Sequence, residues 1–169
     1  MIDRQPTDWR AEAEAEAAAY PRPRTPRLVP RVLAREEMED LLARNAVGRL
    51  AFTFHDRVDV LPITYAFDGR WIYCRTGHGQ KLATLRHNPW VAFEVDEVEG
   101  PFSWRSVVVH GTVYLLESDG PPIERAAWRR ALAILGETIP EAFGDRDPTP
   151  ERTVLFRIEA AELTGRAAG

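Results

Sequence analysis

A threonine, two glycines and a lysine lie within six residues, from Thr76 to Lys81, and residues of these types can form an anion site. Gly77 and Gly79 let a ligand approach the backbone closely, because they carry no side chain. Lys81 begins a segment with helical spacing, and the free N–H groups and dipole of a helix N-terminus favour a phosphate. The stretch is not a P-loop, since the spacing and the lysine–serine/threonine pair are missing. A glycine-rich turn before a helix also occurs simply as a turn.

Three antiparallel strands are predicted directly before this turn, over residues 50–54, 58–67 and 71–76. Apolar and polar residues alternate along them, which is typical of half-buried strands. Asp68-Gly69 is the strongest hairpin signal in the chain, because glycine adopts a positive φ without steric cost. Pro62 cannot donate to a ladder, so its strand is predicted to be an edge, a bulge or a place where the backbone meets something other than a strand.

The other expected elements surround these strands. Helices are predicted over 35–46, 81–88 and 121–135, strands over 91–96, 104–117 and 153–163, and a loop over 97–103. The helix over 121–135 is expected to bury Ile123, Ala127, Trp128, Ala131, Leu132 and Leu135. A glycine in the middle of the long strand, Gly111, indicates a bulge or a tight bend. Six strands with short helices favour a small antiparallel barrel, mainly β with peripheral helices. A barrel of this size fills its interior with side chains, so a cofactor must lie in a surface groove or at a subunit interface.

Composition excludes several classes of function. The chain has 169 residues, enough for one domain with a real core, and its net charge of −4 argues against a general nucleic-acid binder. One cysteine cannot form an intrachain disulfide, and four histidines show no metal-ligand spacing. No apolar stretch has the length of a membrane span and no signal-peptide core is present, so no membrane association and a cytoplasmic location are expected.

The first part of the chain differs in composition from the rest. Residues 1–31 are predicted to form a flexible arm and residues 32–169 the folded domain. Residues 21–31 hold four prolines, four arginines and no acid, a composition typical of a flexible tail or an extended arm. An arm that crosses to a second subunit or binds an acidic partner fits the same residues.

The order of the segments resembles the pyridoxamine 5′-phosphate oxidase-like flavin-binding split barrels. The segments that carry the resemblance are GRLAF, LPITYAFDGRWIYCRTGHGQK, NPWVAFEVD, WRSVVVHGTVYLLE and FRIEAAELTGR. It covers residues 35–166, includes the family's interval between Lys81 and Asn88-Pro89, and is strongest to short bacterial flavin-nucleotide-binding proteins, the nitroimidazole-resistance type among them. It implies a six-stranded antiparallel split β-barrel that binds FMN at a homodimer interface.

The resemblance also implies the residues of the cofactor site. Lys81 matches the lysine that holds the FMN phosphate, and Arg75 and Thr76 match strand-end residues beside that phosphate. Three residues match the strand whose backbone follows the isoalloxazine edge: Pro62, Ile63 and Thr64. A last group comes from the long strand, where Ser106 matches a glutamine of the oxidase that reaches the flavin, with Trp104 and Arg105 next to it.

The sequence departs from the family's pattern in three places. Gln80 stands where the oxidase has its second basic phosphate ligand, and Cys74 stands where the nitroimidazole-resistance type commonly has histidine. The oxidase's C-terminal substrate-binding segment has no counterpart after Gly165, so oxidation of pyridoxamine phosphate is not expected.

Each assignment has a simpler alternative. Arg75 can be a surface residue paired with an acid across the sheet, and Ser106 an ordinary strand serine. Trp104 can simply cover the end of the barrel, since large aromatic residues usually serve packing. Cys74 is expected to be an inert buried thiol, because nothing near it in sequence lowers the pKa of a thiol.

The expected function is an oxidoreductase that uses FMN at a homodimer interface to reduce or oxidise a small molecule. The flavin would supply the chemistry, which explains why no strong set of catalytic residues is present. A deazaflavin or a haem in the same groove is one alternative, and a non-enzymatic flavin carrier or sensor is another. A deazaflavin carries an anionic tail, for which the arginines of the predicted arm would be suitable partners.

Overall fold

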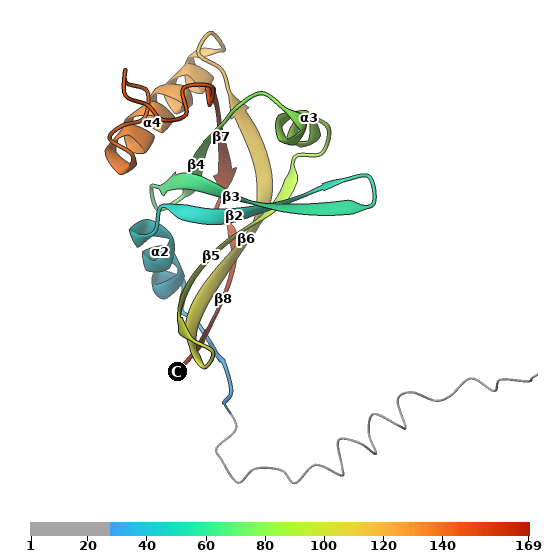
Figure 1. Cartoon of the computed structure of the whole chain (residues 1–169), viewed down its shortest axis with the longest axis vertical. Coiled ribbons are helices and arrows are strands. Elements are labelled where there is room, and N and C mark those ends of the chain that lie inside the picture. Colours follow the sequence, from blue (N-terminus) through green and yellow to red (C-terminus); the bar gives the residue numbers. More distant parts are fainter. Residues whose placement is uncertain (1–27) are drawn as a thin grey trace, which may run out of the picture.

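The computed structural model describes residues 28–169 (Figure 1). Its strands are β1 Arg31–Val32, β2 Val47–Phe54, β3 Arg57–Phe67, β4 Trp71–Thr76, β5 Trp90–Gly100, β6 Ser103–Leu116, β7 Val154–Glu159 and β8 Glu162–Ala168. Its helices are α2 Arg35–Arg44, α3 Gln80–His87 and α4 Pro122–Thr138. The predicted arm lies outside the described residues as far as residue 27, and Arg31, the last residue assigned to it, already pairs with β8.

Six of the strands close into an antiparallel barrel in the order β6-β5-β2-β3-β4-β7, with β7 pairing back to β6. The length of β6 makes this closure possible. One edge of β6 follows β5, while the other edge pairs first with β8 and then with β7. The strands β1 and β8 extend the sheet beyond the barrel. The predicted fold class, a six-stranded split barrel with peripheral helices, is confirmed.

Gly111 lies where the edge of β6 passes from β8 to β7, between His110, which pairs with Glu162, and Val113, which pairs with Ile158. A Cβ atom at Gly111 would lie 2.9 Å from Cγ2 of Ile158 and 3.0 Å from the carbonyl oxygen of Glu159. The glycine therefore permits a close approach of two strands at this position.

Gly111→Ala is expected to lower the free energy of unfolding by about 1–3 kcal/mol, because a backbone carbonyl cannot move aside as a flexible side chain does. Urea denaturation measures this value. Gly100→Ala is the matched control, since a Cβ atom there would meet nothing within 4 Å. The control is expected to stay within about 0.5 kcal/mol of the parent. Equal losses in the two variants would contradict the role of Gly111.

Three expectations from the sequence are wrong in detail. The strand expected over residues 153–163 is two strands, because β7 and β8 pair with different parts of β6 and the chain steps between them at residues 160–161. The loop expected over residues 97–103 is mostly strand, since β5 and β6 continue pairing to Gly100 and Ser103. In α4, Ile123 is 79% exposed in the first turn, and Ile134 is buried instead.

Large side chains fill the interior of the barrel, among them Leu50, Tyr65, Phe93, Val109 and Phe156. The helix α2 packs its buried residues Met38, Leu41 and Leu42 against this cluster. The Tyr65 hydroxyl donates a hydrogen bond of 2.7 Å to the Leu42 carbonyl, which satisfies its one buried polar group. A tricyclic ring therefore has no place inside the barrel. No helix within residues 28–169 is long and apolar enough to cross a membrane.

Candidate functional site

The strands β3 and β4 separate soon after the hairpin that joins them. They pair only from Tyr65–Cys74 to Phe67–Ile72, whereas Arg57 to Thr64 of β3 have β2 as their only strand neighbour within residues 28–169. The unpaired edge of β3 presents backbone N–H and C=O groups that a ligand can bind. Pro62 lies on this edge, and an edge was one of the three positions predicted for its strand. Ile63 beside it turns its side chain into the barrel.

The turn after β4 leads into α3, where Gly79 is the N-cap residue. Among the residues that the structure describes, no side chain caps this N-terminus. N–H groups in the first turn of a helix favour an anion. A Cβ atom at Gly77 would lie 3.3 Å from the carbonyl oxygen of Glu151, so the loop before β7 passes directly beside this turn.

Lys81 is the second residue of α3, and its side chain is half-buried. Within residues 28–169 it forms no ion pair with a carboxylate. Burial lowers the pKa of the Lys81 ammonium, and the charge of Arg152 acts in the same direction. A desolvated cation beside a second cation is stabilised by an anion, so the position of Lys81 suits a phosphate.

Arg75 is at the end of β4, as predicted, but its guanidinium is directed to an internal carboxylate. It donates hydrogen bonds to both oxygens of Asp147 and, at 2.7 Å, to the hydroxyl of Thr149. Arg75 is only 5% exposed. It does pair with an acid, but this pair is buried and does not lie on the surface. Because Asp147 neutralises this arginine, Lys81 would be the main cation to balance the negative charge of a bound phosphate.

The stability that the Arg75–Asp147 pair contributes is expected to be lost in acid. Arg75, and then the N–H groups of Phe143 and Thr149, hold the pKa of Asp147 below its ordinary value. The carboxylate contributes stability above the unfolded-state pKa of about 3.9, and this is lost as the pH falls towards the lower folded-state pKa. The melting temperatures of the parent and of Asp147→Asn are therefore expected to differ most near neutral pH and to become similar in acid. A difference in melting temperature that does not change with pH would show that ionisation of Asp147 is not its cause.

Cys74 faces the interior of the barrel and is fully buried. Burial raises the pKa of its thiol, so the sulfur stays protonated and poorly nucleophilic at neutral pH. The expected inert thiol agrees with this environment. Within the described part of the chain, no group of histidine, cysteine, aspartate and glutamate side chains could hold a metal ion.

The remaining predicted residues lie near the start of β6, where this strand runs beside the C-terminal strand β8 (Figure 1). They are Trp104, Arg105 and Ser106, which pair with the last residues of β8. Three strand spacings, roughly 14 Å, separate β6 from the open edge of β3 in the order β6-β5-β2-β3. Arg105 lies 3.6 Å from the Glu97 carboxylate. The two groups of predicted site residues therefore do not meet within one chain.

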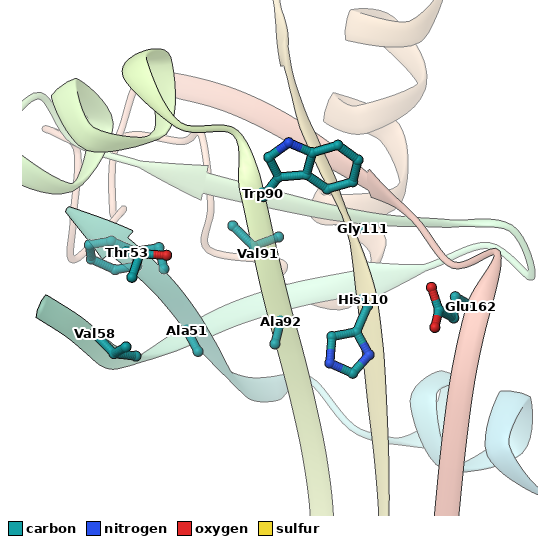
Figure 2. A pocket seen from close by; sticks show the side chains of 10 residues that line it. Ala51, Thr53, Val58, Trp90, Val91, Ala92, His110, Gly111 and Glu162 are labelled. Atoms are coloured by element: carbon teal, nitrogen blue, oxygen red, sulfur yellow. The ribbon is translucent and has the colours of Figure 1, made fainter. Parts of the chain in front are cut away.

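Part of the predicted site lies on one surface, which we name the outer face: the side of strands β8-β6-β5-β2-β3 that points away from the barrel interior. By the alternation of strand residues, this side includes Pro62 and Thr64 of β3 and Trp104 and Ser106 of β6. Val60, Ala51, Ala92 and His110 follow one another across it in register. The small alanine side chains leave a hollow of about 350 Å³. Figure 2 shows Trp90, His110 and Glu162 around this hollow, with Ala51, Ala92 and Val58 across it.

Comparison with known proteins identifies the family of the chain. Residues 34–167 match the pyridoxamine 5′-phosphate oxidase family. The chain belongs to the pyridoxamine 5′-phosphate oxidase family. An uncharacterized family relative from Rhizobium meliloti is 35% identical over 148 residues, covering 82% of this chain and 95% of the relative.

Two solved structures share both sequence and fold with this family member. An FAD-binding protein of Mesorhizobium loti is 28% identical, with a TM-score of 0.68 over 83% of this chain and 99% of the other. An FAD-binding protein of Mycobacterium smegmatis is 25% identical, with a TM-score of 0.59 over 82% of this chain and 98% of the other. The resemblance to the family seen in the sequence is thus confirmed.

Arg152 is a further candidate for the site that the sequence did not reveal. It lies in the loop before β7, and the pairing of Thr76 with Val154 brings this loop to the end of β4. Its charge acts on Lys81, although the two residues are far apart in sequence. In the sequence, Arg152 is simply a basic residue shortly before the last barrel strand. No spacing rule connects such a residue to a phosphate site.

Proposed function

We propose that the chain is an oxidoreductase that binds FMN at a homodimer interface and reduces or oxidises a small molecule. The observation that carries the proposal is the position of Lys81 at the start of α3: its side chain is half-buried and, within residues 28–169, it has no carboxylate partner and the helix start no side-chain cap. The family match and the two similar FAD-binding proteins support a flavin as the ligand.

The chain's own residues would bind and orient the cofactor. Lys81 and the first-turn N–H groups of α3 suit the phosphate, because charged and dipolar donors converge there. The open edge of β3 at Pro62–Thr64 offers backbone groups to the polar edge of a ring. The ring has to lie outside the filled barrel, and when bound it supplies the hydride or electron transfer.

A second copy of the chain would complete the site. Several apolar side chains on and beside the outer face are strongly exposed: Val47, Val58, Val60, Leu61 and Trp90. A large exposed apolar patch is typical of an interaction surface. Packing of two such faces around a two-fold axis would bring Ser106 of the partner subunit towards the ring, which one chain alone cannot do.

An absorbance spectrum tests the cofactor directly. The purified protein, mixed with FMN and freed of excess ligand, is expected to keep the bands of oxidised flavin. Retention of a haem or a deazaflavin in preference to FMN would overturn the proposal. Bleaching of the bound flavin by a nicotinamide reductant, followed by reoxidation by a small-molecule acceptor, would separate an oxidoreductase from a flavin carrier.

A further inference from the structure

A second cleft lies between α4 and the loop over residues 139–153, away from the outer face. Its volume is about 310 Å³. Trp128 and Leu132 of α4 form one wall, Phe143 and Pro150 of the loop form another, and Leu155 of β7 lies between them. A concave site of this size with a mainly apolar lining is suited to a small organic molecule.

The loop that forms this cleft is built around one buried carboxylate. Asp147 accepts hydrogen bonds from Arg75, from the N–H of Phe143 at 2.9 Å and from the N–H of Thr149 at 2.8 Å. These contacts hold Phe143 at a φ of 66°, in the left-handed region that a bulky residue rarely adopts. The loop is therefore fixed in one shape before any ligand arrives, and the cleft is preformed.

Two aromatic side chains line the cleft from different elements. Phe143 is 42% exposed, and the guanidinium of Arg75 lies 5.1 Å from the centre of its ring. This buried cation supports the phenylalanine ring from the inner side. Trp128 adds a second aromatic surface from α4. A flat ligand ring makes favourable stacked or edge-to-face contacts with such surfaces, which an aliphatic group does not.

The charges that line the cleft leave one cation free. The charged lining residues are Arg75, Asp147 and Arg152. Arg75 and Asp147 neutralise each other, because both are buried and two hydrogen bonds join them. Within residues 28–169, Arg152 has one carboxylate partner, Glu151 at 3.9 Å, and both of these side chains are exposed. An exposed pair of this kind contributes little, so Arg152 is available to an anion.

These features define the chemistry of a matching ligand. The aromatic surfaces favour a flat ring, and the single free cation favours one negative charge. A guanidinium binds a carboxylate through two parallel N–H donors, and Thr153, which also lines the cleft beside Arg152, adds a hydroxyl. A phosphate ester fits less well, because the described lining holds no cation for its second charge.

We propose that this cleft binds a small aromatic carboxylate, with its ring beside Phe143 and Trp128 and its carboxylate at Arg152. The site uses neither Lys81 nor the open edge of β3. It therefore stands independently of the proposed flavin function and adds a second ligand to it.

Titration calorimetry with cinnamate and two matched analogues tests the site. Cinnamamide lacks the charge of cinnamate, and cyclohexylpropionate lacks its aromatic ring. The parent protein is expected to bind cinnamate roughly tenfold more tightly than cinnamamide and a few-fold more tightly than cyclohexylpropionate. Arg152→Gln should remove the preference over cinnamamide, and Phe143→Leu the preference over cyclohexylpropionate. Arg152 is exposed, so its replacement leaves a folded protein even if Phe143→Leu does not fold.

Ile123→Ala is the control, because it shortens an exposed apolar side chain on the same helix as Trp128. It should change none of the three affinities. Nuclear magnetic resonance of the isotope-labelled protein locates the ligand: cinnamate should shift the amide signal of Gly144 and the indole N–H signal of Trp128, which both line the cleft.

Several results would overturn the site. They are a parent that does not bind cinnamate, equal affinities for cinnamate and either analogue, and an Arg152→Gln variant that keeps the parent's preference. Signal shifts confined to the first turn of α3 would overturn it as well, because cinnamate would then occupy the candidate phosphate site. Cinnamate binding with shifts at Gly144 and Trp128, in a protein that does not retain FMN, would support the site while the proposed flavin function failed.

Discussion

Lys81→Ala is expected to weaken FMN binding by roughly ten- to a hundredfold while leaving riboflavin binding nearly unchanged. A phosphate carries about −1.5 to −2 charges near neutral pH, and a hydrogen bond to a charged group contributes about 1.5–3 kcal/mol. Since about 1.4 kcal/mol corresponds to a tenfold change in affinity, this loss gives the expected range. Asp147 neutralises Arg75, and Gln80 is uncharged, so neither replaces the missing ammonium.

Titration of both ligands into both proteins, followed by quenching of flavin fluorescence, measures the effect. Arg86→Ala is the matched control, because it removes a cation from the last turn of the same helix, away from its N-terminus. The control should bind FMN as the parent does. Equal losses of FMN and riboflavin in Lys81→Ala, or no loss of either, would show that Lys81 does not hold the phosphate.

Features of the fold that depend on residues close together in the sequence were predictable from it. The Asp68-Gly69 turn, at which Gly69 has a φ of 92°, fixes the β3–β4 hairpin locally. Alternating residues likewise marked β3 as a strand, and the missing N–H of Pro62 left an edge as one of three alternatives. The order of such segments was enough to identify the family, because each piece carries its own local signal.

Contacts between distant segments were not predictable in the same way. The end of the last strand was misplaced because β7 and β8 are defined by their partner β6 rather than by their own residues. The partner of Arg75 is Asp147, which lies in a loop without periodicity. The helical spacing of α4 indicated a buried stripe, but it did not show that the first turn, with Ile123, is exposed.

Val60→Glu is expected to convert the proposed homodimer into a monomer and, with it, to weaken flavin binding. Val60 is 58% exposed in the single chain, and its register with Ala51 and Ala92 puts it on the outer face, in the same row as the two alanines of the hollow. A glutamate there remains solvated in a monomer but becomes an unpaired buried charge in a dimer. Such a charge costs several kcal/mol, so the dimer should weaken by roughly a hundredfold or more.

Sedimentation equilibrium with excess FMN measures the assembly, and a flavin titration at the same protein concentration measures the site. Ile123→Glu adds the same charge at an exposed isoleucine of α4, away from the outer face, and should leave both properties unchanged. A parent that sediments as a monomer, or a Val60→Glu variant that remains a dimer, would contradict an interface at this face. Because Lys81 lies at the start of α3 and Ser106 lies where β6 pairs with β8, a monomeric variant should keep the phosphate contact and lose the partner's contact to the ring. Its flavin affinity is therefore expected to fall for FMN and riboflavin alike, the opposite of the selectivity expected for Lys81→Ala.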